Sequence, residues 1–174
     1  GSRLSGSVRR PTSVQVLKLK EIVYRGGLVR FRVPAHWVEE LEPEGGGTFY
    51  DPAQGSRTLR LNVITMCAPE RITPETMPTL LRGFQHQRGA DAAVRDLANG
   101  RALLSYTRHT SESGARIVIR YWELGAPVPP AHARLAVFSY TVLEDEFATP
   151  AVQETLSLLD REISAAQFAP ELSE

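Results

Sequence analysis

Residues 28–66 constrain the fold more than any other stretch of this chain, because strand patterns, a proline and three consecutive glycines follow one another there. Val29, Phe31 and Val33 alternate with arginines, which predicts a strand with one apolar and one polar face. Pro34 has no backbone N–H to give to a sheet, so it ends this strand. The glycines then separate it from a short strand and a long one.

The long strand begins near Arg57 and has the clearest alternation in the sequence. Successive side chains of a strand point to opposite faces of the sheet. One face of this strand is therefore apolar, and the other is mixed. The apolar face carries Leu59, Leu61 and Val63, and the other carries Arg60, Asn62 and Ile64.

Short turns connect most of the predicted strands. Gly26-Gly27 and Asn99-Gly100 are typical of tight hairpins, since such turns need residues that accept positive φ. A further turn is predicted at 111–114, and the proline-rich segment 125–132 is predicted to be a rigid loop. Strands joined by short turns run antiparallel, because a parallel pair needs a long crossover connection. The sequence therefore predicts a mainly antiparallel sheet of about six or seven strands.

Amphipathic helices are predicted at two places beside this sheet. The first extends from Thr76 to about Gln87, which places Pro78 in the first turn, where a missing N–H costs nothing. The second begins after Thr149, a residue type that caps helices, with Pro150 at its first position. An antiparallel sheet flanked by helices is an α+β fold.

The length of 174 residues predicts one domain, which we place at residues 13–170. Residues 1–12 resemble a flexible leader that begins with a cloning scar, Gly1-Ser2. Residues 13–24 fit either one strand or a short helix followed by a strand.

The charges and the single cysteine limit the expected surroundings of the protein. Its 20 basic and 20 acidic residues predict no attraction to nucleic acid. No stretch approaches the ~20 apolar residues of a membrane span, so membrane insertion is not predicted. Cys67 alone fits a reducing compartment, hence a cytoplasmic protein, but a removed N-terminal signal would leave no trace in this sequence. Monomer and homodimer both remain open.

The sequence contains no motif for catalysis or for cofactor binding. It has no G-x-S-x-G nucleophile elbow, and Cys67 has no histidine beside it in the chain. Gly45–Gly47 precede a strand pattern instead of the Lys-Ser/Thr pair that a phosphate-binding loop requires. Spacings typical of zinc and calcium sites are absent. We therefore expect a protein that is not an enzyme and that uses no metal or other cofactor. A hydrolase whose catalytic residues converge from distant positions would show no such motif and is a third, less favoured alternative.

One set of residues predicts a binding surface. Several strands combine an apolar face with an opposite face that holds arginine and aromatic side chains, the types enriched in binding hot spots. If these mixed faces coincide, they form one surface for a protein partner. The apolar faces hold Leu59, Leu61, Val63, Ile117 and Ile119, and the candidate binding residues opposite are Arg60, Asn62, Arg116, Arg120, Trp122 and Tyr140, with Arg134 and Phe138 alongside. In the alternative interpretation, a helix covers the aromatic side chains and the arginines extend into water.

Several motifs occur in a fixed order along the chain: F-x-V-P-x-x-W at 31–37, G-T-F-Y-D-P at 47–52, T-L-R-L-N-V at 58–63 and F-S-Y-T at 138–141. Together they resemble small bacterial proteins of the PsbP-like fold class. That class includes a eukaryotic Ran-GTPase-binding factor and bacterial secretion-effector chaperones. The resemblance covers residues 22–168 and implies an α/β/α sandwich with an antiparallel sheet and a non-enzymatic accessory role.

The expected function is binding of a protein partner through a sheet face or edge, of which a secretion-effector chaperone is one version. The alternative is a small-molecule carrier or sensor with a pocket between sheet and helix. A protein partner needs a contact patch of roughly 800 Å² on this side, whereas a small ligand needs a cavity of roughly 300 Å³ or more.

Overall fold

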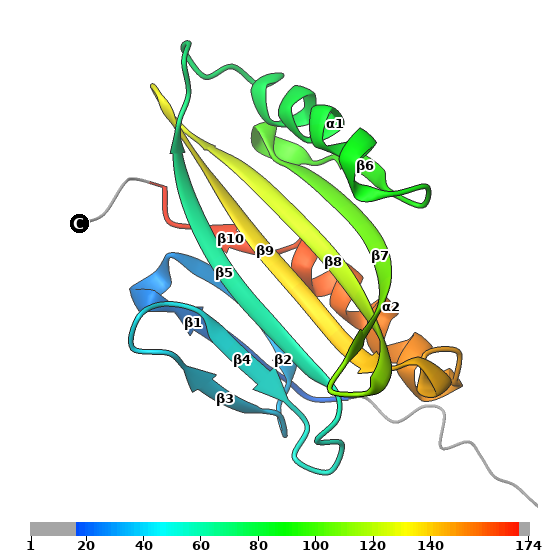
Figure 1. The fold of residues 1–174 in the computed structure, drawn as a ribbon. Coiled ribbons are helices and arrows are strands. Elements are labelled where there is room, and N and C mark those ends of the chain that lie inside the picture. Colours follow the sequence, from blue (N-terminus) through cyan, green and yellow to red (C-terminus); the bar gives the residue numbers. More distant parts are fainter. Residues whose placement is uncertain (1–16, 171–174) are drawn as a thin grey trace, which may run out of the picture.

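The computed structural model describes residues 17–170, which form two antiparallel sheets and two α-helices (Figure 1). The expected leader, residues 1–12, and residues 13–16 lie outside the described part. The strands are β1 (Leu19–Tyr24), β2 (Val29–Pro34), β3 (Val38–Leu41), β4 (Gly47–Tyr50), β5 (Thr58–Cys67), β6 (Ala93–Asp96), β7 (Ala102–Glu112), β8 (Ala115–Val128), β9 (His132–Leu143) and β10 (Gln167–Phe168). The α-helices are α1 (Thr76–Arg88) and α2 (Pro150–Ser164), and the 3-10 helices are η2 (Arg25–Gly27), η3 (Ala98–Gly100) and η4 (Glu144–Glu146).

The main sheet has seven strands in the order β3-β4-β5-β9-β8-β7-β6, and each neighbouring pair is antiparallel. The small sheet has the order β1-β2-β10. It packs with α2 on one face of the main sheet, which we call the α2 face. α1 packs on the opposite face, the α1 face, over one end of β7 and β8 (Figure 1). The predicted antiparallel α+β fold is confirmed, although the first hairpin lies with β10 in a separate small sheet.

Tight turns lie where the sequence predicted hairpins. Gly26 and Gly27 between β1 and β2 have φ of 71° and 104°. Asn99 and Gly100 between β6 and β7 have φ of 64° and 73°. Glycine and asparagine tolerate this left-handed region better than other residues do. The turn chemistry in the sequence therefore determined where the chain reverses.

Both predicted helices are also present. Pro78 lies in the first turn of α1, as expected from its missing N–H. Thr149 caps α2, because its Oγ1 accepts a hydrogen bond from the backbone N–H of Val152 at 3.4 Å, and Pro150 occupies the first helical position.

Aromatic rings fill the core between the main sheet and the small sheet. Phe31 contacts Phe49 and Phe138 edge-to-face, with ring centroids 5.4 Å and 5.1 Å apart. Trp37 follows the proline corner and stacks on Tyr140 with 6.2 Å between centroids. The corner at the end of β2 is therefore architectural, since it carries Trp37 into the core.

On the α1 face, a glycine leaves space for a side chain of the helix. Met77 and Leu81 of α1 are fully buried against this face. A Cβ at Gly125 of β8 would overlap the terminal methyl group of Met77. The absence of a side chain at Gly125 therefore leaves the space that the end of the Met77 side chain occupies.

The prediction that the proline-rich segment 125–132 is a loop is wrong, because most of this segment belongs to strands. β8 continues through Pro127 to its end at Val128, so only three residues form the turn before β9. The last residue of β8 that pairs with β7 is Gly125. Beyond it β8 pairs with β9 alone, and the missing N–H of Pro127 interrupts no ladder on the β7 side.

Candidate functional site

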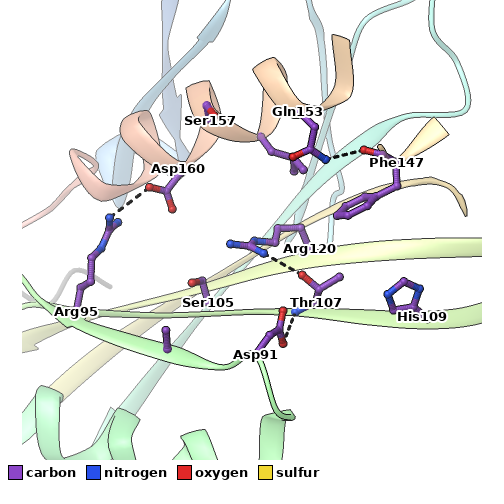
Figure 2. Close-up of a pocket in the computed structure, with 12 residues that line it drawn as sticks. Asp91, Arg95, Ser105, Thr107, His109, Arg120, Phe147, Gln153, Ser157 and Asp160 are labelled. Carbon is purple, nitrogen blue, oxygen red and sulfur yellow. Dashed lines mark hydrogen bonds and ion pairs between the residues drawn. The ribbon is translucent and has the colours of Figure 1, made fainter. Parts of the chain in front are cut away.

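A groove of about 800 Å³ lies on the α2 face, between α2 and strands β6, β7 and β8 (Figure 2). This volume is within the range of small-molecule sites. The residues around it are Asp91, Ala93, Arg95, Ser105, Thr107, His109, Arg120, Phe147, Gln153, Leu156, Ser157 and Asp160.

The strands form the floor of the groove, and their register determines which side chains meet there. Thr107 of β7 pairs with Arg120 of β8 across the antiparallel ladder. The Arg120 guanidinium donates a hydrogen bond from Nη1 to Thr107 Oγ1 at 2.9 Å, and it extends into the groove (Figure 2). Thr107 also donates its backbone N–H to Asp91 Oδ1 at 3.2 Å. Hydroxyl, guanidinium and carboxylate groups therefore converge at one point.

α2 forms the opposite wall. Gln153, Ser157 and Asp160 lie at spacings of four and three residues, so they share one face of the helix. Asp160 accepts a hydrogen bond from Trp122 Nε1 at 3.1 Å and forms an ion pair with Arg95 at 3.3 Å. These two contacts tie α2 to the sheet, and the ion pair with Arg95 balances the charge of the Asp160 carboxylate.

The six candidate binding residues lie on both faces of the main sheet. Leu59 of β5 pairs with Tyr140 of β9, which pairs with Arg120 of β8, so these three side chains share the α2 face. Alternation along β8 places Arg116 and Trp122 on that face as well. Arg60 and Asn62 point to the α1 face. The prediction of a single binding surface is therefore wrong. The arginine and aromatic side chains of β8 and β9 lie on the same face as the leucines of β5, and Arg60 and Asn62 lie on the other face.

The aromatic members of this set belong to the core. Trp122 is 0% exposed and Tyr140 is 3% exposed. For these two residues the alternative interpretation, in which aromatic side chains are covered, is therefore the correct one. Side chains of the small sheet and of α2 pack over them. Ile117 and Ile119, expected on the face of the β5 leucines, point instead to the α1 face, as their partners Leu143 and Thr141 do.

Arg116 lies at the exposed end of β8 and forms an ion pair with Glu144 of η4 at 2.6 Å. Hydrogen bonding from Arg116 lowers the pKa of the Glu144 carboxyl, although slight burial opposes it. Arg116 is thus paired at the surface, whereas Arg60 and Asn62 are exposed on the α1 face. A binding role for Arg60 and Asn62 remains a prediction.

Strand β5 has a free edge for part of its length. β4 pairs with it only over Leu59–Leu61, whereas β9 pairs with all of Thr58–Cys67. Within residues 17–170, no strand pairs with the other edge of β5 from Asn62 to Cys67. Ile64, in the middle of this segment, has half of its surface exposed. The segment 62–67 therefore has no strand paired along this edge among the described residues, and we call it the β5 edge.

A cysteine and a histidine that are distant in sequence meet at the end of β5. Cys67 pairs with His132 of β9, and its Sγ lies 3.5 Å from His132 Nε2. Nucleophilic catalysis usually requires a third group that orients the histidine. No such group hydrogen-bonds His132 among residues 17–170, so the pair lacks the arrangement of a catalytic triad.

The described part of the chain contains no cluster of three or more histidine, cysteine, aspartate or glutamate residues arranged to hold a metal ion. None of its helices is long and apolar enough to cross a membrane.

The sequence predicted Arg120 but missed the polar residues around it. Ser105 and Thr107 alternate with Leu104 and Tyr106 on β7, and this alternation could have revealed a polar stripe. No motif connects that stripe with Asp91 or with α2. Only the packing of α2 on the sheet brings these groups together.

No protein-family model and no curated protein matches this sequence. Solved structures do match, at 14% sequence identity. A Bacteroides thetaiotaomicron protein has a TM-score of 0.58 over 86% of this chain and 48% of its own, so this chain spans about half of that protein. LpqN, involved in cell envelope biogenesis of Mycobacterium tuberculosis, has a TM-score of 0.56 over 90% of this chain and 93% of its own. Cyanobacterial PsbP from Synechocystis is also among the matches, with a TM-score of 0.41 over 93% of this chain and 99% of its own.

These likenesses concern the fold alone. The first two structures agree with the observed antiparallel sheet flanked by helices. That is the architecture implied by the resemblance to the PsbP-like class.

Proposed function

We propose that the protein is a non-enzymatic accessory protein that binds an extended segment of a protein partner along the β5 edge. The observation that carries this proposal is the end of the β4–β5 ladder at Leu61, while β5 continues to Cys67. An unpaired edge presents a row of backbone N–H and C=O groups to any added strand. Proteins commonly cover such an edge or protect it with charged or bent segments.

The side chains at this edge support the same role. Arg60, Asn62 and Ile64 alternate along β5 and therefore share the α1 face next to the edge. In strand addition, backbone hydrogen bonds supply affinity and alternate side chains supply specificity. Ile64 offers an apolar contact, and Arg60 can bind a carboxylate through its planar guanidinium. A chaperone that holds an extended segment of a secreted effector is one version of this function.

The expected compartment is the cytoplasm. Cys67 is exposed on β5 and forms no disulfide among the described residues. An exposed thiol is compatible with a reducing environment. This localisation is part of the proposal.

The proposal is tested with Ile64→Lys and a matched control, Leu41→Lys. Leu41 is 53% exposed on β3 and Ile64 is 50% exposed, so both changes add a charge at an exposed apolar position. Immobilised wild-type protein is used to capture a partner from a lysate of the source cells. We expect Ile64→Lys to lose the partner and Leu41→Lys to retain it, with all three proteins melting at similar temperatures.

Hydrogen exchange then locates the contact. The captured partner, once purified, should slow the exchange of backbone amides in residues 62–67 when it is added to the wild-type protein. Capture that is unchanged by Ile64→Lys, or protection confined to other strands, would overturn the proposal.

A second candidate function is that of a small-molecule carrier or sensor. The groove of about 800 Å³ between α2 and the sheet favours it, because this is a pocket between sheet and helix. Native mass spectrometry of the purified protein tests this candidate. A bound small molecule that is displaced when Ser157 in the groove wall is replaced by leucine would support it, and a bound molecule unaffected by that change would count against it.

A further inference from the structure

We propose that Arg120 forms the anion-binding subsite of the groove and that the ligand is a small organic carboxylate with one negative charge. This inference rests on the second candidate function, since it assigns a ligand class to the same groove. It is independent of the partner site at the β5 edge, because Arg120 and Ile64 lie on opposite faces of the main sheet.

The partners of the other half-buried arginines distinguish Arg120 from them. Arg57 forms an ion pair with Glu146 at 3.1 Å, and Arg88 forms one with Glu123 at 2.9 Å. Arg101 donates hydrogen bonds to backbone carbonyl oxygens at the end of α2. A half-buried guanidinium in this protein is thus usually paired with acceptors.

Arg120 has no such charged partner. Among residues 17–170 its hydrogen bond is to the neutral hydroxyl of Thr107, and it belongs to none of the ion pairs. The two carboxylates that line the groove have other partners. Asp160 contacts Arg95 and Trp122, and Asp91 accepts a hydrogen bond from the backbone N–H of Thr107. Guanidinium has five N–H donors in a planar fork, so most of the donors of Arg120 remain available to a ligand.

The fork binds a carboxylate through two parallel hydrogen bonds. The hydroxyls of Ser105 and Ser157 line the same groove and can add further hydrogen bonds. Leu156 and Phe147 provide apolar surface for the carbon skeleton of the ligand. The subsite therefore has the mixed polar and apolar lining that fixes a small organic anion.

The acidic groups of the groove restrict the charge of the ligand. The groove contains Arg95 and Arg120 as cations and Asp91 and Asp160 as anions, so its formal charges cancel. A dianion would gain from Arg120 but would be repelled by the Asp91 carboxylate, whose hydrogen-bond partner is an uncharged backbone N–H. One negative charge is the best match, which favours a carboxylate over a phosphate.

The experiment uses the whole chain, labelled with ¹⁵N, and hexanoate as the probe. Increasing hexanoate should cause saturable shifts of the amide signals near Ser105, Thr107 and Arg120. Hexanol, which has the same chain without the charge, should cause no saturable shift there. Inorganic phosphate should bind more weakly than hexanoate.

Two variants and one control complete the test. Arg120→Gln should weaken hexanoate binding at least about tenfold, the loss expected for a charge-assisted hydrogen bond. Ser157→Leu keeps Arg120 but narrows the groove from the exposed side of α2, and it should also weaken binding. Arg71→Gln changes an exposed arginine outside the groove and should leave binding unchanged. Thermal melting confirms that each variant is folded.

Equal hexanoate affinity in Arg120→Gln and wild type would overturn the proposal, as would the absence of saturable shifts in the groove. Phosphate binding as tight as hexanoate binding would overturn the carboxylate assignment. If native mass spectrometry instead found an uncharged molecule in the groove, the carrier function would stand and the anion subsite would fail. Partner capture at the β5 edge should be unaffected by Arg120→Gln in every case.

Discussion

Arg88, the last residue of α1, donates hydrogen bonds to both carboxylate oxygens of Glu123 in β8, at 2.9 Å and 3.4 Å. Glu123 is only 3% exposed and also accepts a hydrogen bond from the Tyr106 hydroxyl. Burial, followed by the hydrogen bond to Glu123, raises the pKa of Tyr106 well above its ordinary value. This buried network fixes the end of α1 to the sheet, on the face opposite the groove.

We expect Arg88→Ala to lower the free energy of unfolding by about 3 kcal/mol, because it leaves a buried carboxylate without its cation. The double variant Arg88→Met, Glu123→Leu should be much closer to wild type, since it removes both charges together. Urea denaturation measures both values. A loss below about 0.5 kcal/mol in Arg88→Ala would show that the pair contributes little.

Buried and exposed members of the candidate binding set should differ sharply in their effect on stability. Trp122→Ala should destabilise the fold by about 3–5 kcal/mol, because the side chain is fully buried in the core. The double variant Arg60→Ala, Asn62→Ala should change stability by at most about 0.5 kcal/mol, since both side chains are exposed. Thermal and urea unfolding would check this, and equal losses in the two proteins would contradict the assignment of faces.

Gly125→Ala should cost about 1 kcal/mol or more, because the new methyl group would overlap the end of the Met77 side chain. Shortening Met77 to alanine opens a cavity and is destabilising by itself. The double variant should nevertheless be more stable than the sum of the single losses predicts. A double-mutant cycle measures this coupling, and strict additivity would mean that the two residues do not contact each other.

Stability should fall in alkaline solution through Tyr140. Burial is the main cause that raises the pKa of Tyr140 to about 12, from an ordinary value of 10.0. Below pH 10 both folded and unfolded chains keep this proton, so the contribution of Tyr140 is fully present. Between pH 10 and 12 the unfolded chain loses the proton first, and stability falls by about 2 kcal/mol.

Tyr140→Phe serves as the comparison for this effect, because it keeps the ring that stacks on Trp37 but has no ionisable hydroxyl. The difference in unfolding free energy between wild type and Tyr140→Phe should shift in favour of the variant above pH 10. Parallel curves up to pH 12 would contradict the raised pKa.

The local pattern of residues predicted most secondary structure. Thr149 with Pro150 specified the start of α2, and the alternation from Leu59 specified β5, because capping and alternation are properties of neighbouring residues. The continuation of β8 through Pro127 could not be predicted in this way. It depends on where β7 begins beside it, which is a relation between two strands.

The candidate site shows the same division. Alternation correctly placed Arg116, Arg120 and Trp122 on one face of β8, but both faces of that strand carry apolar residues. The pattern of β8 alone therefore could not show which of its two faces lies on the same side of the sheet as Leu59. The register through β9 decided it and placed Trp122 in the core.

The sequence by itself determined the turns, the helices and the alternation within each strand, since short-range sterics and hydrogen bonding control these features. Only the tertiary structure decided the relative phase of separate strands, the free edge of β5 and the isolation of Arg120 from any carboxylate partner among residues 17–170. These features depend on contacts between segments distant in sequence. The groove exists for that reason, because residues of β6, β7, β8 and α2 come together only when the helix packs on the sheet.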